Sequence, residues 1–177
     1  MYYDDLGVSA QKQDVHVAIK NIDQGLFPGA FCKAIPDIFS GSSQHCLLSH
    51  SDGAGTKSIL AYLHYKTYGD PNIFKGIAQD SLVMNLDDLL CVGAIGPYIM
   101  SNTIGRNSTK ISGEIIKAII DGYQEFIDMM SPYIEIIPCG GETADMGDII
   151  RTIVVDSTLT TSMRISDFID CCELPQP

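Results

Sequence analysis

One segment near the end of the chain, RTIVVDSTLTTSMRI at residues 151–165, places the strongest constraint on the fold. It is rich in β-branched side chains, which is typical of a long β-strand. We interpret it as apolar on both faces, and such a strand needs cover that a chain of 177 residues supplies only in part. The segment therefore predicts a β-sheet that completes its packing in an oligomer interface.

Helix-like and strand-like patterns alternate along the rest of the chain. Apolar residues at helical spacing predict helices at 14–26, 75–94 and 112–130. Asp14 and Ser112 are the expected N-caps of the first and last helix, and Gly25 is the expected end of the first. Short apolar runs predict strands at 45–51, 97–104 and 133–141, and the last strand is expected to end in a glycine turn. The pattern of residues 58–69 fits either a helix or a strand. This alternation predicts an α+β (mixed α/β) fold.

The apolar faces of the two longer helices are explicit in the sequence. The face of helix 75–94 is expected to consist of Leu82, Leu86, Leu89 and Leu90. The face of helix 112–130 is expected to consist of Ile115, Ile119, Tyr123, Phe126 and Met130. Both faces are expected to pack against the sheet.

The composition excludes several classes of partner. The chain is 45% hydrophobic and 19% charged, which is typical of a globular protein. Its net charge of −11 repels a phosphate backbone, so we expect no nucleic-acid partner. No apolar run reaches the roughly 18 residues of a membrane span, and the start, MYYDDLGVSAQ, lacks the basic region of a secretory signal. We therefore expect a cytoplasmic protein without a membrane partner.

The six cysteines show no pair at the C-x₂-C spacing of a zinc or redox site. We interpret them as free thiols in a reducing compartment. Cys46 and Cys91 stand in apolar contexts and are expected in the core.

The stretch SHSDGAGTK, residues 49–57, resembles a phosphate-binding loop without matching the common one. Gly53 and Gly55 are too close together, and Thr56 precedes Lys57 instead of following it. Asp52 would repel a phosphate unless a cation lies between them. The stretch therefore indicates either a metal-bridged phosphate site or a simple glycine turn after a strand.

Two further stretches carry acidic groups. Asp80 and Asp87 are two helical turns apart on one side of the predicted helix, with Asp88 close to that side. These carboxylates indicate either a divalent-cation site or a solvated helix face. In CGGETADMGD, residues 139–148, two glycines precede acids that fit a metal, ribose hydroxyls or a wide polar turn. Taken together, the three stretches indicate a Mg²⁺-bridged polyphosphate site with Lys57 as the positive charge.

Three segments, SDGAGTK, GIAQDSLVMNLDDLLCVGA and GGETADM, follow one another in an order and at separations that resemble a known family. The family is phosphoribosylformylglycinamidine cyclo-ligase, the aminoimidazole ribonucleotide synthetase of purine biosynthesis. The chain resembles its N-terminal, ATP-binding domain from GVSA near residue 7 to about residue 165. The wider superfamily includes formylglycinamide ribonucleotide amidotransferase, thiamine-phosphate kinase, selenophosphate synthetase and the hydrogenase-maturation protein HypE.

The resemblance implies an ATP site that uses Mg²⁺. Asp52 takes the family's magnesium position, and Asp80 and Asp88 take its metal and nucleotide positions. Nucleotide contacts are implied for Asp52, Gly53, Gly55, Thr56, Lys57, Gly140, Gly141 and Glu142. Of the implied site residues, we expect Lys57 and Asp88 to act in catalysis. The resemblance also implies a homodimer in which the strands of two domains close a shared barrel.

The implied reaction converts formylglycinamidine ribonucleotide to aminoimidazole ribonucleotide. ATP phosphorylates the formyl amide oxygen, a nitrogen of the same molecule closes the ring, and ADP and phosphate are released. Residues 1–165 would be the ATP-binding domain, with 1–14 as an arm or loop, 166–177 as an irregular tail and the family's C-terminal domain absent. The alternatives are the ATP-binding half of another kinase or synthetase of the superfamily, or an inactive nucleotide-binding or dimerisation module.

Two positions depart from the family's pattern. Asp87 stands where the commoner motif has Asn, which adds a negative charge beside the implied metal. The N-terminal pattern A-G-V-D-I appears as Leu6–Ala10 without its acid.

Overall fold

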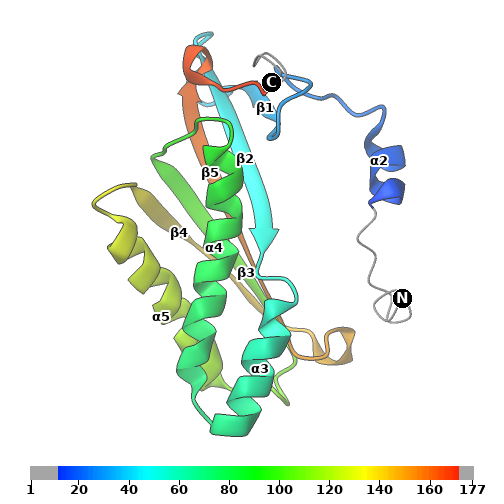
Figure 1. Ribbon diagram of the computed structural model, residues 1–177, viewed down its shortest axis with the longest axis vertical. Coiled ribbons are helices and arrows are strands. Elements are labelled where there is room, and N and C mark those ends of the chain that lie inside the picture. The colour runs from blue at the N-terminus through cyan, green and yellow to red at the C-terminus, as the bar shows by residue number, and fades with distance from the viewer. Residues whose placement is uncertain (1–11, 172–177) are drawn as a thin grey trace.

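The structure is a computed structural model that describes residues 12–171 (Figure 1). The pattern at Leu6–Ala10, most of the expected N-terminal arm and the end of the expected tail lie outside the described residues.

Five strands form one mixed sheet in the order β1–β2–β5–β3–β4. Their bounds are β1 Ala34–Pro36, β2 His45–Gly53, β3 Tyr98–Arg106, β4 Ile136–Asp145 and β5 Ile153–Arg164. β3 and β4 pair in parallel, and the other neighbours pair antiparallel. Helices and strands mix as the sequence predicts, and the sheet is open, with β1 and β4 as its edges within the described residues.

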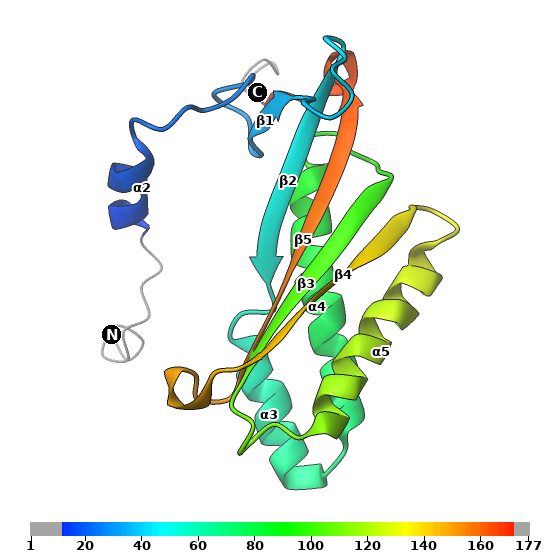
Figure 2. The same ribbon diagram turned by 180° about the vertical axis from the view of Figure 1, so that it is seen from behind.

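The described α-helices are α2 Gln13–Ile19, α3 Lys57–Tyr68, α4 Lys75–Leu90 and α5 Gly113–Met130, and the 3-10 helices are η1 Pro71–Phe74, η2 Gly147–Ile149 and η3 Ile165–Asp167. α4 and α5 lie side by side on one face of the sheet, and none of the described helices covers the opposite, open face (Figures 1 and 2). No helix within residues 12–171 is long and apolar enough to cross a membrane. The site described below lies where β2 passes into α3, at one end of the sheet.

The side chains of β5 alternate strictly between the two faces of the sheet. Val155, Ser157 and Leu159 are buried under the helices, while Thr158 and Thr160 lie on the open face. The interpretation of this strand as apolar on both faces is therefore wrong, because its second face is largely polar. Hydroxyl pairs reinforce that face: Ser51 with Thr158 and Ser49 with Thr160, each at 2.9 Å.

Several element boundaries differ from the sequence predictions. The first helix begins after Lys12 and ends at Ile19, so Asp14 is not its N-cap and Gly25 is not its end. Residues 57–68 form a helix, which settles the ambiguity there, and the short strand β1 was missed. β4 continues through its glycines to Asp145, so the glycine turn predicted at residue 141 is wrong.

The predicted core is mostly confirmed. Leu82, Leu86 and Leu89 are buried, as are Ile115, Ile119, Tyr123 and Phe126, and Met130 is partly buried. Leu90 is 38% exposed although Leu89 beside it is fully buried, because the next residue lies about 100° round the helix, at the edge of the buried stripe. Cys46 is buried, but Cys91 is exposed, since it follows the last residue of α4.

A single buried amide ties α4 to two strands. Asn85 is fully buried, and its Nδ2 donates to the main-chain oxygens of Asp52 at 3.2 Å and Ser157 at 3.0 Å, and to Ser157 Oγ at 2.9 Å. Its Oδ1 lies 3.0 Å from His50 Nδ1. Because the amide reaches both β2 and β5, it fixes the helix relative to the strand that carries Asp52.

We expect Asn85→Ala to lower the free energy of unfolding by about 2–4 kcal/mol, because it leaves buried carbonyl and hydroxyl groups without their donor. Urea unfolding followed by circular dichroism measures this change. Gln79→Ala, on the exposed side of the same helix, is the matched control and should change stability by less than about 0.5 kcal/mol. Equal stability of the two variants would contradict the role assigned to Asn85.

Candidate functional site

The DGAGTK segment joins the end of β2 to the start of α3. Asp52 and Gly53 are the last residues of the strand, Thr56 is the N-cap residue and Lys57 opens the helix. Gly55 turns the chain with a φ of 56°, a conformation that favours glycine. The turn therefore presents its backbone at the N-terminus of a twelve-residue helix, where the helix dipole favours anions.

Two acidic residues of neighbouring strands lie at this end of the sheet, Asp52 in the row of the buried Ser157 and Asp156 on the open face. Asp156 on β5 is the register partner of Gly53, and a Cβ on Gly53 would lie 1.8 Å from Asp156 Oδ1. Burial, and after it the negative charge of Asp52, raises the pKa of Asp156 above its ordinary value. Within residues 12–171 neither carboxylate has a basic partner. Glycine at position 53 is thus required by the close approach of Asp156.

Lys57 already has an acidic partner on α4. Its Nζ donates to Asp80 Oδ1 at 2.8 Å, with the lysine side chain 59% exposed and the aspartate 30% exposed. A pair this accessible is weak, so Lys57 can exchange Asp80 for a stronger anion such as phosphate.

Asp88 is held by a histidine of β2. His50 Nε2 lies 3.1 Å from Asp88 Oδ2, and the other ring nitrogen contacts Asn85 Oδ1 at 3.0 Å. The Asn85 amide orientation is fixed by the acceptors around its Nδ2, so His50 faces an acceptor on both sides.

The GGE stretch lies at the level of the DGAGTK segment, but not beside it. The register places Asp52, Ser157, Asn102 and Gly141 in one row across the sheet, and Gly53, Asp156, Thr103 and Glu142 in the next. Three strand spacings separate the ends of each row, which is about 14 Å. Within one chain, therefore, the structure brings Lys57 to Asp80 but does not bring Gly140, Gly141 or Glu142 to them.

The acids of α4 are also spread out. Asp80 and Asp88 are eight residues apart on the helix, or about 12 Å along its axis, so one ion cannot bind both directly. The side chain of Asp87 is exposed. Among the described residues no group of three or more His, Cys, Asp and Glu side chains gathers around a common point.

A magnesium ion nevertheless fits the carboxylate of Asp52. Mg²⁺ is usually held by one or two carboxylates, with water and substrate phosphates completing its shell. Asp52 has no basic partner within residues 12–171, and its Oδ1 accepts from Gly53 N at 2.7 Å, so it can supply one such carboxylate.

The sequence interpretation missed Asp156, His50 and Asn85. Asp156 is an acidic residue within a segment rich in β-branched residues, and only this contrast marked it in the sequence. His50 and Asn85 become visible only when β2 and α4 are packed together, because they are 35 residues apart in the chain.

Comparison with known proteins places most of the chain in one family. Residues 33–162 match the family described as "AIR synthase related protein, N-terminal domain". A phosphoribosylformylglycinamidine cyclo-ligase of Saccharolobus solfataricus is 38% identical over 104 residues, which are 58% of this chain and 27% of that protein. The cyclo-ligase of Methanocaldococcus jannaschii is 27% identical over 124 residues, or 70% of this chain and 31% of that protein. The chain thus aligns with less than a third of each of these relatives.

Solved structures share the fold at low sequence identity. PurL from Thermotoga maritima, in a complex with FGAR, has a TM-score of 0.60 at 14% identity and covers 95% of this chain and 26% of that chain. The same protein complexed with ATP has a TM-score of 0.52 at 15% identity over 99% of this chain and 28% of that chain. Thiamine monophosphate kinase from Aquifex aeolicus has a TM-score of 0.52 at 9% identity over 89% of this chain and 42% of that chain.

We expect Asp156→Asn to stabilise the metal-free protein at pH 7 by up to about 1 kcal/mol, because it removes a charge that burial and Asp52 disfavour. The pKa is raised in the folded state, so the folded protein binds the proton more tightly. The gain should therefore shrink as the pH falls through the folded pKa and vanish below the ordinary value near 4. Urea unfolding in EDTA at neutral and acidic pH measures it.

Asp87→Asn, which removes an exposed charge, serves as the control and should show little difference between the two pH values. A destabilised Asp156→Asn variant at pH 7 would show that Asp156 makes a favourable contact instead.

Proposed function

Because the chain belongs to the family of the AIR synthase related protein, N-terminal domain, we propose that it is the ATP-binding half of an ATP-dependent phosphoribosylformylglycinamidine cyclo-ligase of purine biosynthesis. The observation that carries this proposal is the junction of β2 and α3, where Asp52, a glycine turn and Lys57 meet at a helix N-terminus.

In this proposal Asp52 holds the magnesium of MgATP. The bound metal would neutralise phosphate charge. Gly53, Gly55 and Thr56 line the turn that receives the phosphates, and Lys57 leaves Asp80 to pair with them. Direct coordination by Asp80 and Asp88 as well would require separate ions, because about 12 Å of helix lies between them.

Asp88 contributes to the proposed site through His50. The pair lies next to the amide that fixes Asp52, so a change in Asp88 reaches the metal ligand through three contacting side chains. Lys57 is proposed to stabilise the charge of the transferred phosphoryl group. The nucleotide contacts proposed for β4 are Gly140, Gly141 and Glu142. About 14 Å separates this part of β4 from the DGAGTK segment of the same chain, so the role is met best when the sheets of two chains combine.

The proposed enzyme would act on formylglycinamidine ribonucleotide, in the cytoplasm, with a second domain completing the substrate site. A kinase of the same superfamily is the second candidate, because thiamine monophosphate kinase from Aquifex aeolicus shares the fold. Turnover assays with each acceptor, using a chain as long as the cyclo-ligase relatives, separate the two.

We expect Asp52→Asn to weaken MgATP binding by at least about tenfold while the fold is retained, since it removes a carboxylate ligand. Isothermal titration calorimetry measures the affinity, and circular dichroism checks the fold. Asp87→Asn is the matched control, because it removes the same charge from an exposed site, and it should bind MgATP like the parent chain. Equal affinity of Asp52→Asn and the parent chain would rule out Asp52 as the metal ligand.

We also propose a homodimer in which the open sheets of two chains form a barrel. The open face carries exposed Ile99, Ile137 and Val154 at 51%, 48% and 44%, which is apolar area that a second sheet would cover. Sedimentation equilibrium should show a dimer at micromolar concentration, and Ile99→Asp should shift it towards monomer. A stable monomer of the parent chain would contradict the dimer.

A further inference from the structure

The last turn of α4 receives a hydrogen bond from a segment that is distant in the chain. Cys32, in the loop before β1, is 3% exposed, and its Sγ donates to the main-chain oxygen of Asp88 at 3.2 Å. The two residues are 56 positions apart in the sequence. A buried cysteine usually acts as a small apolar side chain, so this contact sets Cys32 apart from an ordinary core thiol.

The main-chain oxygen of Asp88 depends on this donor. The last carbonyl groups of a helix have no intrahelical partner and need one from elsewhere. Val92 N, which would complete the helical pattern at Asp88 O, donates to Leu89 O at 3.2 Å instead. Within residues 12–171, therefore, the thiol of Cys32 takes the place of the main-chain donor.

Burial keeps this thiol in the form that donates. It raises the pKa of Cys32 to about 11, and the charges of Asp88 and Cys91 add to the effect. A buried, protonated thiol is a poor nucleophile. Hydrogen bonding and packing are therefore the roles open to Cys32.

The side chain of Asp88 connects this thiol to the proposed site. Asp88 Oδ2 lies 3.1 Å from His50 Nε2, and His50 Nδ1 lies 3.0 Å from Asn85 Oδ1. Asn85 in turn donates to the main-chain oxygen of Asp52 at 3.2 Å. A group that holds the main chain of Asp88 is thus linked to the proposed metal ligand by side chains in direct contact.

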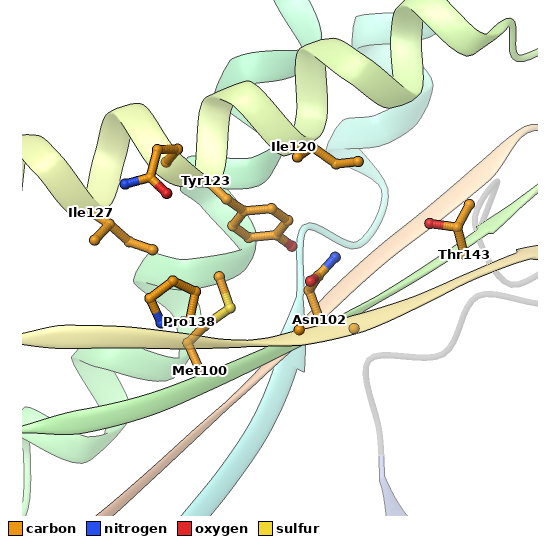
Figure 3. A pocket seen from close by; sticks show the side chains of 10 residues that line it. Met100, Asn102, Ile120, Tyr123, Ile127, Pro138 and Thr143 are labelled. Atoms are coloured by element: carbon orange, nitrogen blue, oxygen red, sulfur yellow. The ribbon is translucent and has the colours of Figure 1, made fainter.

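The neighbouring helix α5 does not hold this turn. The polar contacts that the structure shows between α5 and α4 reach Lys75 and Ser81, in the first half of α4. The contact with Ser81 is made by the hydroxyl of Tyr123, and a cavity of about 310 Å³ beside Tyr123 separates part of α5 from the strands (Figure 3). The last turn of α4 therefore relies on contacts from outside α5.

We propose that Cys32 is a positioning residue of the ATP site, whose thiol holds the last turn of α4 where Asp88 reaches His50. This inference rests on the proposed function, because the side chains that Cys32 positions lead to Asp52. Without the donor, the turn shifts and the contact between Asp88 and His50 loosens. The affinity for MgATP then falls, although Cys32 itself touches neither metal nor nucleotide.

Two substitutions of similar size separate hydrogen bonding from packing. Cys32→Ser keeps a donor in a polar side chain, whereas Cys32→Val is apolar and has no donor. We expect Cys32→Ser to bind MgATP within about twofold of the parent chain and Cys32→Val to bind at least about threefold more weakly, measured by calorimetry. A role in packing alone predicts the opposite order, because a buried hydroxyl is less favourable there than the methyl groups of valine.

A second measurement needs no nucleotide. In NMR spectra of the metal-free chain, the ring signals of His50 should shift in Cys32→Val and stay near their parent positions in Cys32→Ser. Cys46→Val is the matched control, because it replaces a second buried thiol, and it should bind MgATP like the parent chain. Circular dichroism checks that each variant is folded.

Three results would each overturn the proposal: parent-like MgATP binding by folded Cys32→Val, weaker binding by Cys32→Ser than by Cys32→Val, or unchanged His50 signals in Cys32→Val. If Cys32→Val does not fold, Cys32→Ala removes the same donor with a smaller side chain. Absence of MgATP binding by the folded parent chain would overturn the proposed function instead. The His50 signals would then still decide the role of Cys32.

Discussion

The buried amide of Asn85 is the interaction on which the rest of the site depends. It lies in the middle of α4 and donates to main-chain oxygens of β2 and β5 at once. Because an unpaired amide is costly in a core, these contacts allow only one placement of the helix over the two strands. That placement sets Asp80 within reach of Lys57 and Asp88 within reach of His50.

Only some of the acidic side chains around Asn85 have a basic partner. Asp80 and Asp88 each have a basic partner, whereas no basic side chain within residues 12–171 pairs with Asp52 or Asp156. Burial and the charge of Asp52 raise the pKa of Asp156, and a divalent cation would relieve uncompensated negative charge at this end of the sheet. The turn after β2 therefore differs from a common phosphate loop in needing a cation between its acid and a phosphate, and Lys57 is too exposed to meet that need alone.

The sequence predicts the long helices better than it predicts the positions of the site residues. The periodicities of α4 and α5 predict both helices and most of their buried faces, because each helix packs one stripe against the sheet. The glycines of β4 were misread as a turn, since the sequence does not show that Asn102 crowds Gly141 from the next strand. Asp156 and His50 were missed for a related reason: their neighbours are distant in the chain, and Asp156 meets Gly53 only through strand register and His50 meets Asn85 only through packing of α4 on the sheet.

Two glycine-containing motifs lie in one sheet, one at the end of β2 and one in β4. Both depend on strand glycines that give way to a neighbouring side chain, Gly53 to Asp156 and Gly141 to Asn102. This shared feature explains why two glycine-containing motifs lie inside strands, where glycine is otherwise unfavourable.

The central claim is that the turn after β2 holds phosphate through a bridging cation. Calorimetric titration of ATP into the chain, once with Mg²⁺ and once with EDTA, tests it most directly. The account predicts that ATP binds at least about tenfold more tightly with Mg²⁺. Equal affinity under the two conditions would contradict it, because Asp52 would then play no part in holding the nucleotide through a cation.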